Sequence, residues 1–338
     1  MEYRRLGRSG LKVSEICLGT MTFGNGADEG ESARMVHAAL DAGVNFFDTA
    51  NSYVGGVSET MLGKALKGRR GDAVIASKVF NPMGGRPNDS GMSRLHIKQQ
   101  VEDSLRRLQT DYIDVYYIHH VDVQTPLEEM LRAFDDLVRQ GKILYTACSN
   151  YEVWRLMEAL WISDSNGWAR FDAYQPQYSL VVRDIDEELV PACEAKGVGL
   201  VAWSPLAGGY LAGKYRPGNL KAEGTRSAEG WGFNTRFFAA NHAEILQTLI
   251  DTAQEIDRTP AQTALRWVMD QPYMTSAIVG ARNTQQLAET LAAGGWRLPP
   301  SALKALNKVS AQPLRYPRAF EETMVQRRNS AVTPPKAR

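Results

Sequence analysis

The chain contains 338 residues, with 39 lysines and arginines against 38 aspartates and glutamates, so its formal net charge is +1. Hydrophobic residues make up 43% and charged residues 23%, which is typical of a globular protein and excludes a disordered or fibrous chain. A balanced charge provides no electrostatic attraction for nucleic acid or for an anionic membrane, so we expect neither as a partner.

The sequence also lacks the usual marks of a membrane or secreted protein. No stretch approaches the ~18 consecutive apolar residues that a transmembrane helix needs, and residues 1–5 contain no apolar signal core. The three cysteines, Cys17, Cys148 and Cys193, are odd in number and far apart, which favours a reducing compartment over a disulfide framework. We therefore expect a cytoplasmic protein.

Eight short apolar runs alternate with longer segments of helical periodicity. Near-continuous apolar runs are typical of parallel strands that are covered on both faces. They lie at residues 16–19, 44–47, 73–76, 113–118, 143–148, 171–174, 198–203 and 276–279. Apolar residues at steps of three and four predict helices at 31–41, 93–108, 126–139, 151–162, 185–196, 260–269 and 284–292.

Capping residues support the ends of two of these helices. Gly43 and Gly141 follow the helices at 31–41 and 126–139, at the position where a left-handed residue commonly ends a helix. Thr125 and Pro126 predict an N-cap followed by a proline at the first helical position. The local chemistry of these positions therefore agrees with the periodicity.

Strict alternation of strand and helix predicts a parallel sheet with right-handed crossovers. Eight such units over about 280 residues predict an α/β protein with a closed (β/α)8 TIM barrel, for which ~250 residues is typical. An open doubly wound sheet is the alternative, but no strand is followed by a proper dinucleotide-binding glycine pattern. In the segment that comes nearest, residues 24–30, the third glycine is one residue late.

Two segments lie outside the eight units. Residues 1–13 predict a hairpin around a Ser-Gly turn, which would cover the bottom of a barrel. Residues 206–240, after the seventh strand, form a long stretch rich in Gly and Arg and without periodicity, which we interpret as a lid. We expect one domain over residues 1–328 and a flexible tail over residues 329–338, which contain two prolines and few apolar residues.

Reactive side chains stand at the ends of three consecutive predicted strands. Asp48, Lys78 and His119 lie at the ends of the second, third and fourth strands, and Tyr53 lies in the loop after the second. In a barrel these ends share the rim where active sites form. Each residue alone is also explained as a helix cap, a strand end or a packing residue. Together they suit proton transfer, because a lysine ammonium stabilises a tyrosine anion, a carboxylate orients the lysine, and histidine orients a carbonyl.

The same segments carry a family resemblance. Residues 43–53 (GVNFFDTANSY), 111–119 (DYIDVYYIH), 174–180 (YQPQYSL) and 203–209 (WSPLAGG) resemble motifs of the aldo-keto reductases, and the match runs in order from residue 3 to about residue 295. The chain is most similar to the bacterial branch that also resembles voltage-gated potassium-channel β subunits. The resemblance implies a (β/α)8 barrel that binds a nicotinamide dinucleotide without a Rossmann domain.

The resemblance also implies roles for individual residues. The family's catalytic tetrad corresponds to Asp48, Tyr53, Lys78 and His119, with Tyr53 as the general acid. The implied cofactor contacts are Ser149, Asn150 and Gln175 to the nicotinamide carboxamide, Trp203 to the nicotinamide ring, Ser204, Leu206, Gly208 and Lys214 to the pyrophosphate, Gly280 to phosphate, Arg282 to the 2′-phosphate of NADPH, and Gln286 and Glu289 near the adenosine. Thr290 replaces the asparagine usual in the family, so one adenine contact is in question.

These residues predict an NADPH-dependent oxidoreductase that reduces an aldehyde or ketone to an alcohol, with NADPH rather than NADH as the cofactor and a small-molecule carbonyl compound as the substrate. The substrate pocket is expected to include residues 21–26, Phe80, Asn81, His120 and, in the lid, Trp231 and Phe233. His119 and His120 are adjacent rather than spaced for chelation, and no cysteine pair has ligand spacing, so no metal site is predicted.

Two other functions stay open at this point. One is a redox-sensing regulatory subunit that binds NADP and turns over slowly, which the resemblance to channel subunits suggests. The other is a Schiff-base aldolase, because a lysine at a barrel strand end can form an imine. Neither the physiological substrate nor the oligomeric state follows from the sequence.

Overall fold

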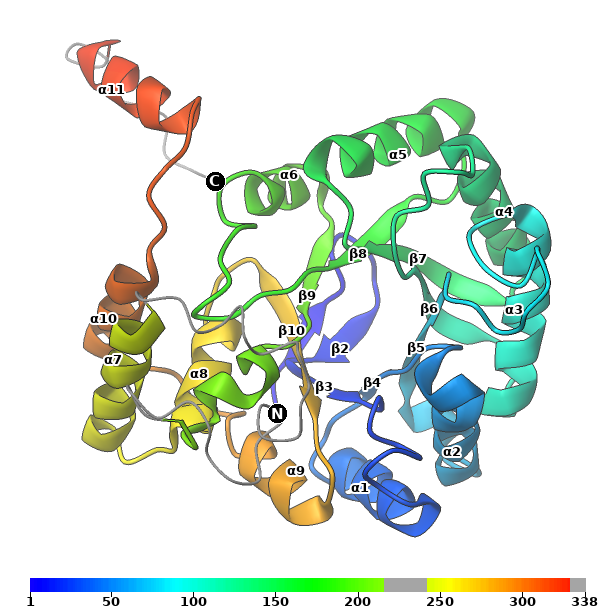
Figure 1. The fold of residues 1–338 in the computed structure, drawn as a ribbon, viewed down its shortest axis with the longest axis horizontal. Helices are drawn as coiled ribbons and strands as arrows, with labels where there is room; N and C mark the ends of the chain where they lie inside the picture. The colour runs from blue at the N-terminus through cyan, green and yellow to red at the C-terminus, as the bar shows by residue number, and fades with distance from the viewer. Residues whose placement is uncertain (216–241, 329–338) are drawn as a thin grey trace.

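A computed structural model describes residues 1–215 and 242–328 and contains eight parallel strands closed into a barrel (Figure 1). The barrel strands are β3 (Ile16–Gly19), β4 (Phe46–Asp48), β5 (Val74–Val79), β6 (Ile113–Ile118), β7 (Ile143–Ser149), β8 (Phe171–Gln175), β9 (Gly199–Ala202) and β10 (Met274–Gly280). β10 pairs with β3 and so closes the ring. The predicted (β/α)8 TIM barrel of the α/β class is confirmed.

Helices surround the barrel on its outside (Figure 1). Those that follow barrel strands are α1 (Glu29–Asp41), α2 (Val57–Ala65), α3 (Arg94–Leu108), α4 (Leu127–Arg139), α5 (Val153–Asn166), α6 (Leu189–Lys196), α8 (Pro260–Met269) and α9 (Thr284–Leu291). Further helices are α7 (His242–Glu255), α10 (Pro300–Ser310) and α11 (Arg318–Arg328), with short 3₁₀ helices η1 (Tyr53–Gly56), η2 (Arg70–Asp72) and η3 (Ala207–Ala212). The helices predicted above do not include α2, α7, α10 or α11, and the predicted start of α6 lies four residues too early.

A hairpin covers one end of the barrel, as residues 1–13 predict. β1 (Tyr3–Arg5) pairs antiparallel with β2 (Lys12–Ser14). Leu6 and Val13 are fully buried in the core inside the barrel, together with Phe46 and Val201. The turn lies so close to the barrel that a Cβ on Gly7 would come within 2.5 Å of the carbonyl oxygen of Asp172. A second, larger core lies between the barrel and the helices.

The predicted helix caps have different outcomes. Gly43 and Gly141 have φ of +86° and +70°, so both take the expected left-handed conformation. The prediction of Thr125 as an N-cap is wrong, because Pro126 occupies the cap position of α4 and has no side-chain capping bond. The Thr125 hydroxyl lies before the helix and donates to Asp122 Oδ2 at 2.8 Å.

The predicted lid is described only in part. Its first residues form η3, where Gly208 and Gly209 have left-handed backbone conformations. Residues 216–240, including Trp231 and Phe233, lie outside the described residues, as does the predicted tail at 329–338. Both interpretations therefore stay predictions.

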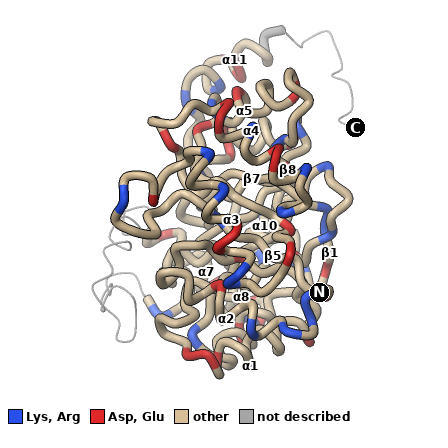
Figure 2. Tube along the Cα trace, turned by 90° about the vertical axis from the view of Figure 1, so that its right-hand side faces the viewer, with Lys and Arg blue, Asp and Glu red and all other residues tan. Residues whose placement is uncertain are grey.

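Charges of both signs are interleaved along the described chain (Figure 2). The positive and negative charges nearly cancel, and the formal net charge of the whole sequence is +1. Within residues 1–215 and 242–328, no helix has the length and apolar character that crossing a membrane requires.

Candidate active site

The carboxyl ends of β4, β5 and β6 bring three of the predicted residues to one rim, and η1 brings the fourth. Lys78 Nζ, which is fully buried, donates hydrogen bonds to Asp48 Oδ1, to Tyr53 Oη at 3.1 Å and to the backbone carbonyl of Thr49 at 2.8 Å. His119 lies edge-on to Tyr53, with ring centroids 5.9 Å apart. The tetrad predicted from separate strand ends is therefore assembled in space.

The surroundings of Lys78 and Tyr53 keep both side chains protonated. Burial lowers the pKa of Lys78, but the negative charge of Asp48 and the hydrogen bonds to Asp48 and Tyr53 outweigh it, so the pKa is raised. Burial also raises the pKa of Tyr53 above its ordinary value, against the opposing effect of the Lys78 charge. At neutral pH the site therefore holds an ammonium group beside a neutral phenol that carries a proton to donate.

His119 is neutral in this environment. Burial, the Lys78 charge and His120 together lower the pKa of His119 to about 2. The His120 ring stacks on it, with centroids 4.4 Å apart and an interplanar angle of 12°. A neutral imidazole cannot act as a proton-donating imidazolium, but it can still form a hydrogen bond that orients a ligand.

A cavity of about 750 Å³ opens at this rim. Predicted site residues that line it are Asp48, Tyr53, His119, Ser149, Asn150, Gln175, Trp203, Ser204, Leu206, Gly208, Lys214, Gly280, Arg282, Gln286 and Glu289. Lys78 lies beneath Asp48 and Tyr53 and does not line the cavity. The cavity thus extends from the tetrad to the start of α9.

The substrate-pocket prediction is met in part. Met21, Thr22 and His120 line the cavity, whereas residues 23–26, Phe80 and Asn81 do not. The Phe80 ring packs edge-on against His120, with centroids 5.3 Å apart, and the Asn81 side chain bonds to His119. Both residues therefore contact the two histidines from behind and do not form part of the cavity wall.

The side chains expected to bind a nicotinamide carboxamide are linked to one another and to the tetrad. Gln175 Nε2 donates to Asp48 Oδ2 at 2.8 Å, and Ser149 Oγ donates to the backbone carbonyl of Gln175 at 2.8 Å. Asn150 Nδ2 donates to the carbonyl of His119, and Asn150 Oδ1 accepts from Trp203 Nε1 at 3.2 Å. These bonds fix the ends of β6, β7, β8 and β9 relative to one another around the cavity.

The far end of the cavity lies at η3 and the N-terminus of α9. The Ser204 hydroxyl accepts from the N–H of Gly208 at 3.0 Å, which shapes the turn after β9. At α9, Gln286 Oε1 accepts from the N–H of Arg282 at 3.0 Å, and Asn283 caps the helix through the N–H of Gln286. The Thr290 hydroxyl donates to carbonyls of its own helix, so it offers no free donor in place of an asparagine amide.

Comparison of the sequence with known proteins identifies the family to which this barrel belongs. Residues 15–311 match the sequence profile of the Aldo/keto reductase family. This chain belongs to that family. Aldo/keto reductase family membership makes the protein an oxidoreductase that acts on carbonyl compounds, and it confirms the resemblance drawn from the motifs.

Relatives of this aldo/keto reductase family member have varied descriptions. An uncharacterized oxidoreductase, YrpG, of Bacillus subtilis is 39% identical over 93% of this chain and 97% of its own length. A probable voltage-gated potassium channel subunit beta of Oryza sativa is 37% identical, with 87% and 91% of the two chains covered. Versiconal hemiacetal acetate reductase of Aspergillus parasiticus is 34% identical, with 91% and 96% covered.

Two supporting residues of this aldo/keto reductase family site lie where sequence reasoning did not place them: Asn81 was expected in the substrate pocket, and Gln285 was not assigned a role. Asn81 bonds to both His119 and Ser52, and Gln285 lines the cavity at the start of α9. The only signal for Asn81 is its position three residues after Lys78, just beyond a strand. Gln285 lies between two predicted contacts, Arg282 and Gln286, and could have been included with them.

Proposed function

We propose that this protein reduces an aldehyde or ketone to an alcohol with NADPH as the cofactor and Tyr53 as the proton donor. The observation that carries the proposal is the 3.1 Å contact between Tyr53 Oη and Lys78 Nζ at the wall of the cavity. An ammonium held by Asp48 stabilises the phenolate that remains after Tyr53 gives up its proton. This geometry supports protonation of an oxygen that develops negative charge.

The cavity residues fit a nicotinamide dinucleotide. Trp203 offers a flat aromatic face, and Gln175 and Asn150 offer amide groups beside the tetrad. The N-terminus of α9 lies at this end of the cavity with the Arg282 guanidinium alongside, and the helix dipole and this positive charge both favour a phosphate. When bound, NADPH supplies a hydride to the carbonyl carbon.

The chain's own residues provide the remaining chemistry. His119 forms a hydrogen bond to the carbonyl oxygen and orients it toward Tyr53. Tyr53 transfers its phenolic proton to that oxygen, which becomes the alcohol, and the phenolate later regains a proton from solvent. Lys78 stays protonated throughout, because Asp48 raises its pKa.

We propose NADPH rather than NADH because of Arg282. A guanidinium binds a phosphate through two parallel hydrogen bonds, and NADH lacks the 2′-phosphate that would receive them. Arg282 lines the end of the cavity beside Gln286 and Glu289.

The test is the Tyr53→Phe variant, assayed for NADPH consumption with a panel of aldehydes, ketones and sugars and with NADH as the cofactor control. Loss of the phenolic proton should lower turnover by roughly 10²–10⁴-fold. NADPH affinity, measured by fluorescence titration, should stay nearly unchanged because the ring remains. Tyr145→Phe is the matched control, since Tyr145 lies in β7 away from the cavity. Turnover of Tyr53→Phe equal to that of Tyr145→Phe would overturn the proposal.

A redox-sensing regulatory subunit is the second candidate, and the similarity to channel β subunits favours it. The same assay separates the two functions. Rapid steady-state oxidation of NADPH with simple aldehydes supports the reductase, whereas NADPH binding with only single-turnover oxidation supports the regulatory subunit.

The aldolase alternative has less support. Lys78 Nζ donates three hydrogen bonds and lies outside the cavity lining. Its raised pKa also opposes the neutral amine that imine formation needs. The arrangement therefore favours Lys78 as a fixed positive charge rather than as a nucleophile.

A further inference from the structure

Asn81 lies between a loop hydroxyl and the ring of His119. Its Nδ2 atom donates to Ser52 Oγ at 3.1 Å and contacts His119 Nδ1 at 3.3 Å. An amide nitrogen carries two N–H groups and no lone pair that accepts, so both contacts are donated by Asn81. Because Ser52 lies one residue before Tyr53, the amide is anchored to the segment that carries the proposed proton donor.

The contact determines which nitrogen of His119 carries its hydrogen. A neutral imidazole has one N–H and one accepting nitrogen. Burial opposes protonation of this ring most strongly, and the positive charge of Lys78 and the neighbouring His120 oppose it further. His119 therefore exists as one of two neutral tautomers, and a donor directed at Nδ1 places the hydrogen on Nε2.

The choice of tautomer matters for the chemistry of the site. His119 lines the cavity beside Tyr53, where a carbonyl oxygen would be protonated. An Nε2–H group donates a hydrogen bond to such an oxygen, whereas an unprotonated Nε2 presents a lone pair that repels it. Among the described residues, no protein group other than Asn81 makes a hydrogen bond to this ring.

We propose that Asn81 is a positioning residue that holds His119 as the Nε2–H tautomer and so directs a hydrogen-bond donor into the cavity. That this donor serves a carbonyl oxygen rests on the proposed function. The tautomer itself does not, since it follows from the bond between Asn81 and Nδ1.

The tautomer is measured directly by nitrogen NMR. The full chain, labelled with ¹⁵N in its five histidines, gives two-bond hydrogen–nitrogen spectra that distinguish Nδ1–H, Nε2–H and the imidazolium. A His119→Gln variant identifies the His119 signals. We expect the Nε2–H pattern for His119 at pH 7 without cofactor. An Nδ1–H or imidazolium pattern in the unmodified protein would overturn the proposal.

Asn81→Asp reverses the bond with little change in shape. A carboxylate accepts and cannot donate, so it should draw a hydrogen onto Nδ1 and give the Nδ1–H tautomer or the imidazolium. Asn88→Asp is the control, because it adds the same charge to an exposed position in the same loop. An Nε2–H pattern that persists in Asn81→Asp also contradicts the proposal, whatever the catalytic activity.

Kinetics then test the link to the reaction. If carbonyl reduction is observed, Asn81→Asp should lower kcat by roughly tenfold or more, the factor expected for one hydrogen bond to a developing charge. NADPH affinity and the Asn88→Asp kinetics should stay near those of the unmodified protein. Unchanged kcat together with an altered tautomer would overturn the link. Absence of any carbonyl reduction in the unmodified protein would instead overturn the proposed function and leave the tautomer result intact.

Discussion

Charge and hydrogen placement around four side chains determine what the rim of this barrel can do. The buried Lys78 ammonium neutralises Asp48 and supports Tyr53, and its positive charge adds to the effect of burial that keeps His119 unprotonated. One cation therefore acts on two neighbours in opposite ways. It stabilises the anion that Tyr53 would become, and it opposes the cation that His119 would become.

The neutral state of His119 predicts acid sensitivity of the fold. Its pKa is about 2 in the folded protein and ~6.5 in an unfolded chain, so between these values only the unfolded chain binds the proton. Stability therefore falls as the pH drops below about 6.5, by up to about 1.4 kcal/mol per pH unit from this group. His119→Gln should remove that part of the slope.

Urea unfolding at pH 4, 5, 6 and 7 measures this difference. Asp172, whose pKa is raised by burial to about 6, contributes equally to both proteins and cancels. His37→Gln, a change on the exposed side of α1, serves as the control. Parallel pH profiles for His119→Gln and the unmodified protein would contradict the prediction.

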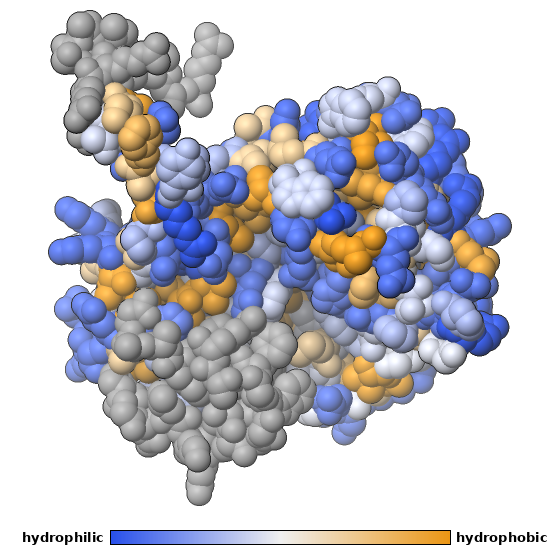
Figure 3. Space-filling view, turned by 45° about the horizontal axis from the view of Figure 1, so that its top comes forward, coloured by the Kyte–Doolittle hydropathy of each residue, from blue (hydrophilic) through white to orange (hydrophobic). Residues whose placement is uncertain are grey.

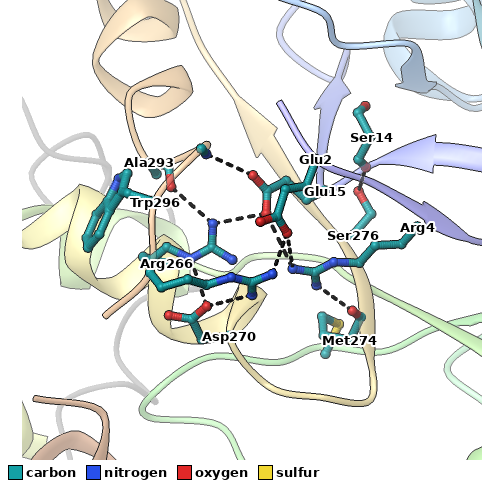
Figure 4. Close-up of polar contacts among 12 residues, drawn as sticks. Glu2, Arg4, Ser14, Glu15, Arg266, Asp270, Met274, Ser276, Ala293 and Trp296 are labelled. Atoms are coloured by element: carbon teal, nitrogen blue, oxygen red, sulfur yellow. Dashed lines mark hydrogen bonds and ion pairs between the residues drawn. The ribbon is translucent and has the colours of Figure 1, made fainter. Parts of the chain in front are cut away.

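At the scale of elements, a buried ionic network joins the hairpin, the barrel and two helical segments (Figure 4). Glu15 lies between β2 and β3, and its Oε2 accepts from Arg266 at 3.0 Å and from Arg4 at 3.3 Å. Its Oε1 accepts from the N–H of Gly295, and Arg266 also pairs with Asp270 at 3.1 Å. Glu15 and Arg266 are both fully buried, so their charges are balanced by the other members of this network rather than by water.

Glu15→Gln should therefore destabilise the protein by about 3 kcal/mol, because it removes one of the two carboxylates that Arg266 faces in a buried site. The free energy of unfolding, measured in urea, tests this value. Glu29→Gln breaks an exposed pair with Lys64 and should cost no more than about 0.5 kcal/mol. If the two variants lose equal stability, the network does not hold these elements together.

At the scale of the whole molecule, the C-terminal helix stands apart from the barrel (Figure 1). Phe320 and Val325 of α11 are 53% and 50% exposed, and hydrophobic side chains are visible on this arm in Figure 3. Its polar contacts to the barrel include the Arg315 N–H and the Arg318 guanidinium, which both donate to Glu187. This arm therefore adds little packing to the barrel.

Removal of residues 312–338 should leave Tm within about 2 °C of that of the full chain, because exposed polar contacts contribute little. Removal of residues 300–338 is the contrasting control. It also deletes α10, whose Leu306 is fully buried and whose Asn307 accepts from Trp267 Nε1 at 2.8 Å. Thermal unfolding followed by circular dichroism compares the three chains. A large loss on the shorter truncation would show that the arm packs on the barrel.

Much of the barrel and of the tetrad could be predicted because the responsible signals are local. Each strand is a short apolar run, and Asp48 and Lys78 lie at strand ends that parallel geometry must bring to one rim. The helix α2 could not be predicted in this way because it contains Gly63, and a glycine weakens a helix in isolation. In the structure a Cβ there would come within 2.5 Å of the Leu108 carbonyl oxygen, so close packing against the end of α3 requires the glycine.

By itself, the sequence determined the alternation of strands and helices, the closed barrel and the residues at its rim, since these depend on periodicity and on the polarity of neighbouring residues. Only the tertiary structure decided that Lys78 lies beneath the cavity, that Asn81 directs the His119 ring, and that Glu15 pairs with Arg266 across 251 positions. Such contacts form only once the barrel closes. They join residues whose separation along the chain has no periodic signal, and burial sets the strength of their charges.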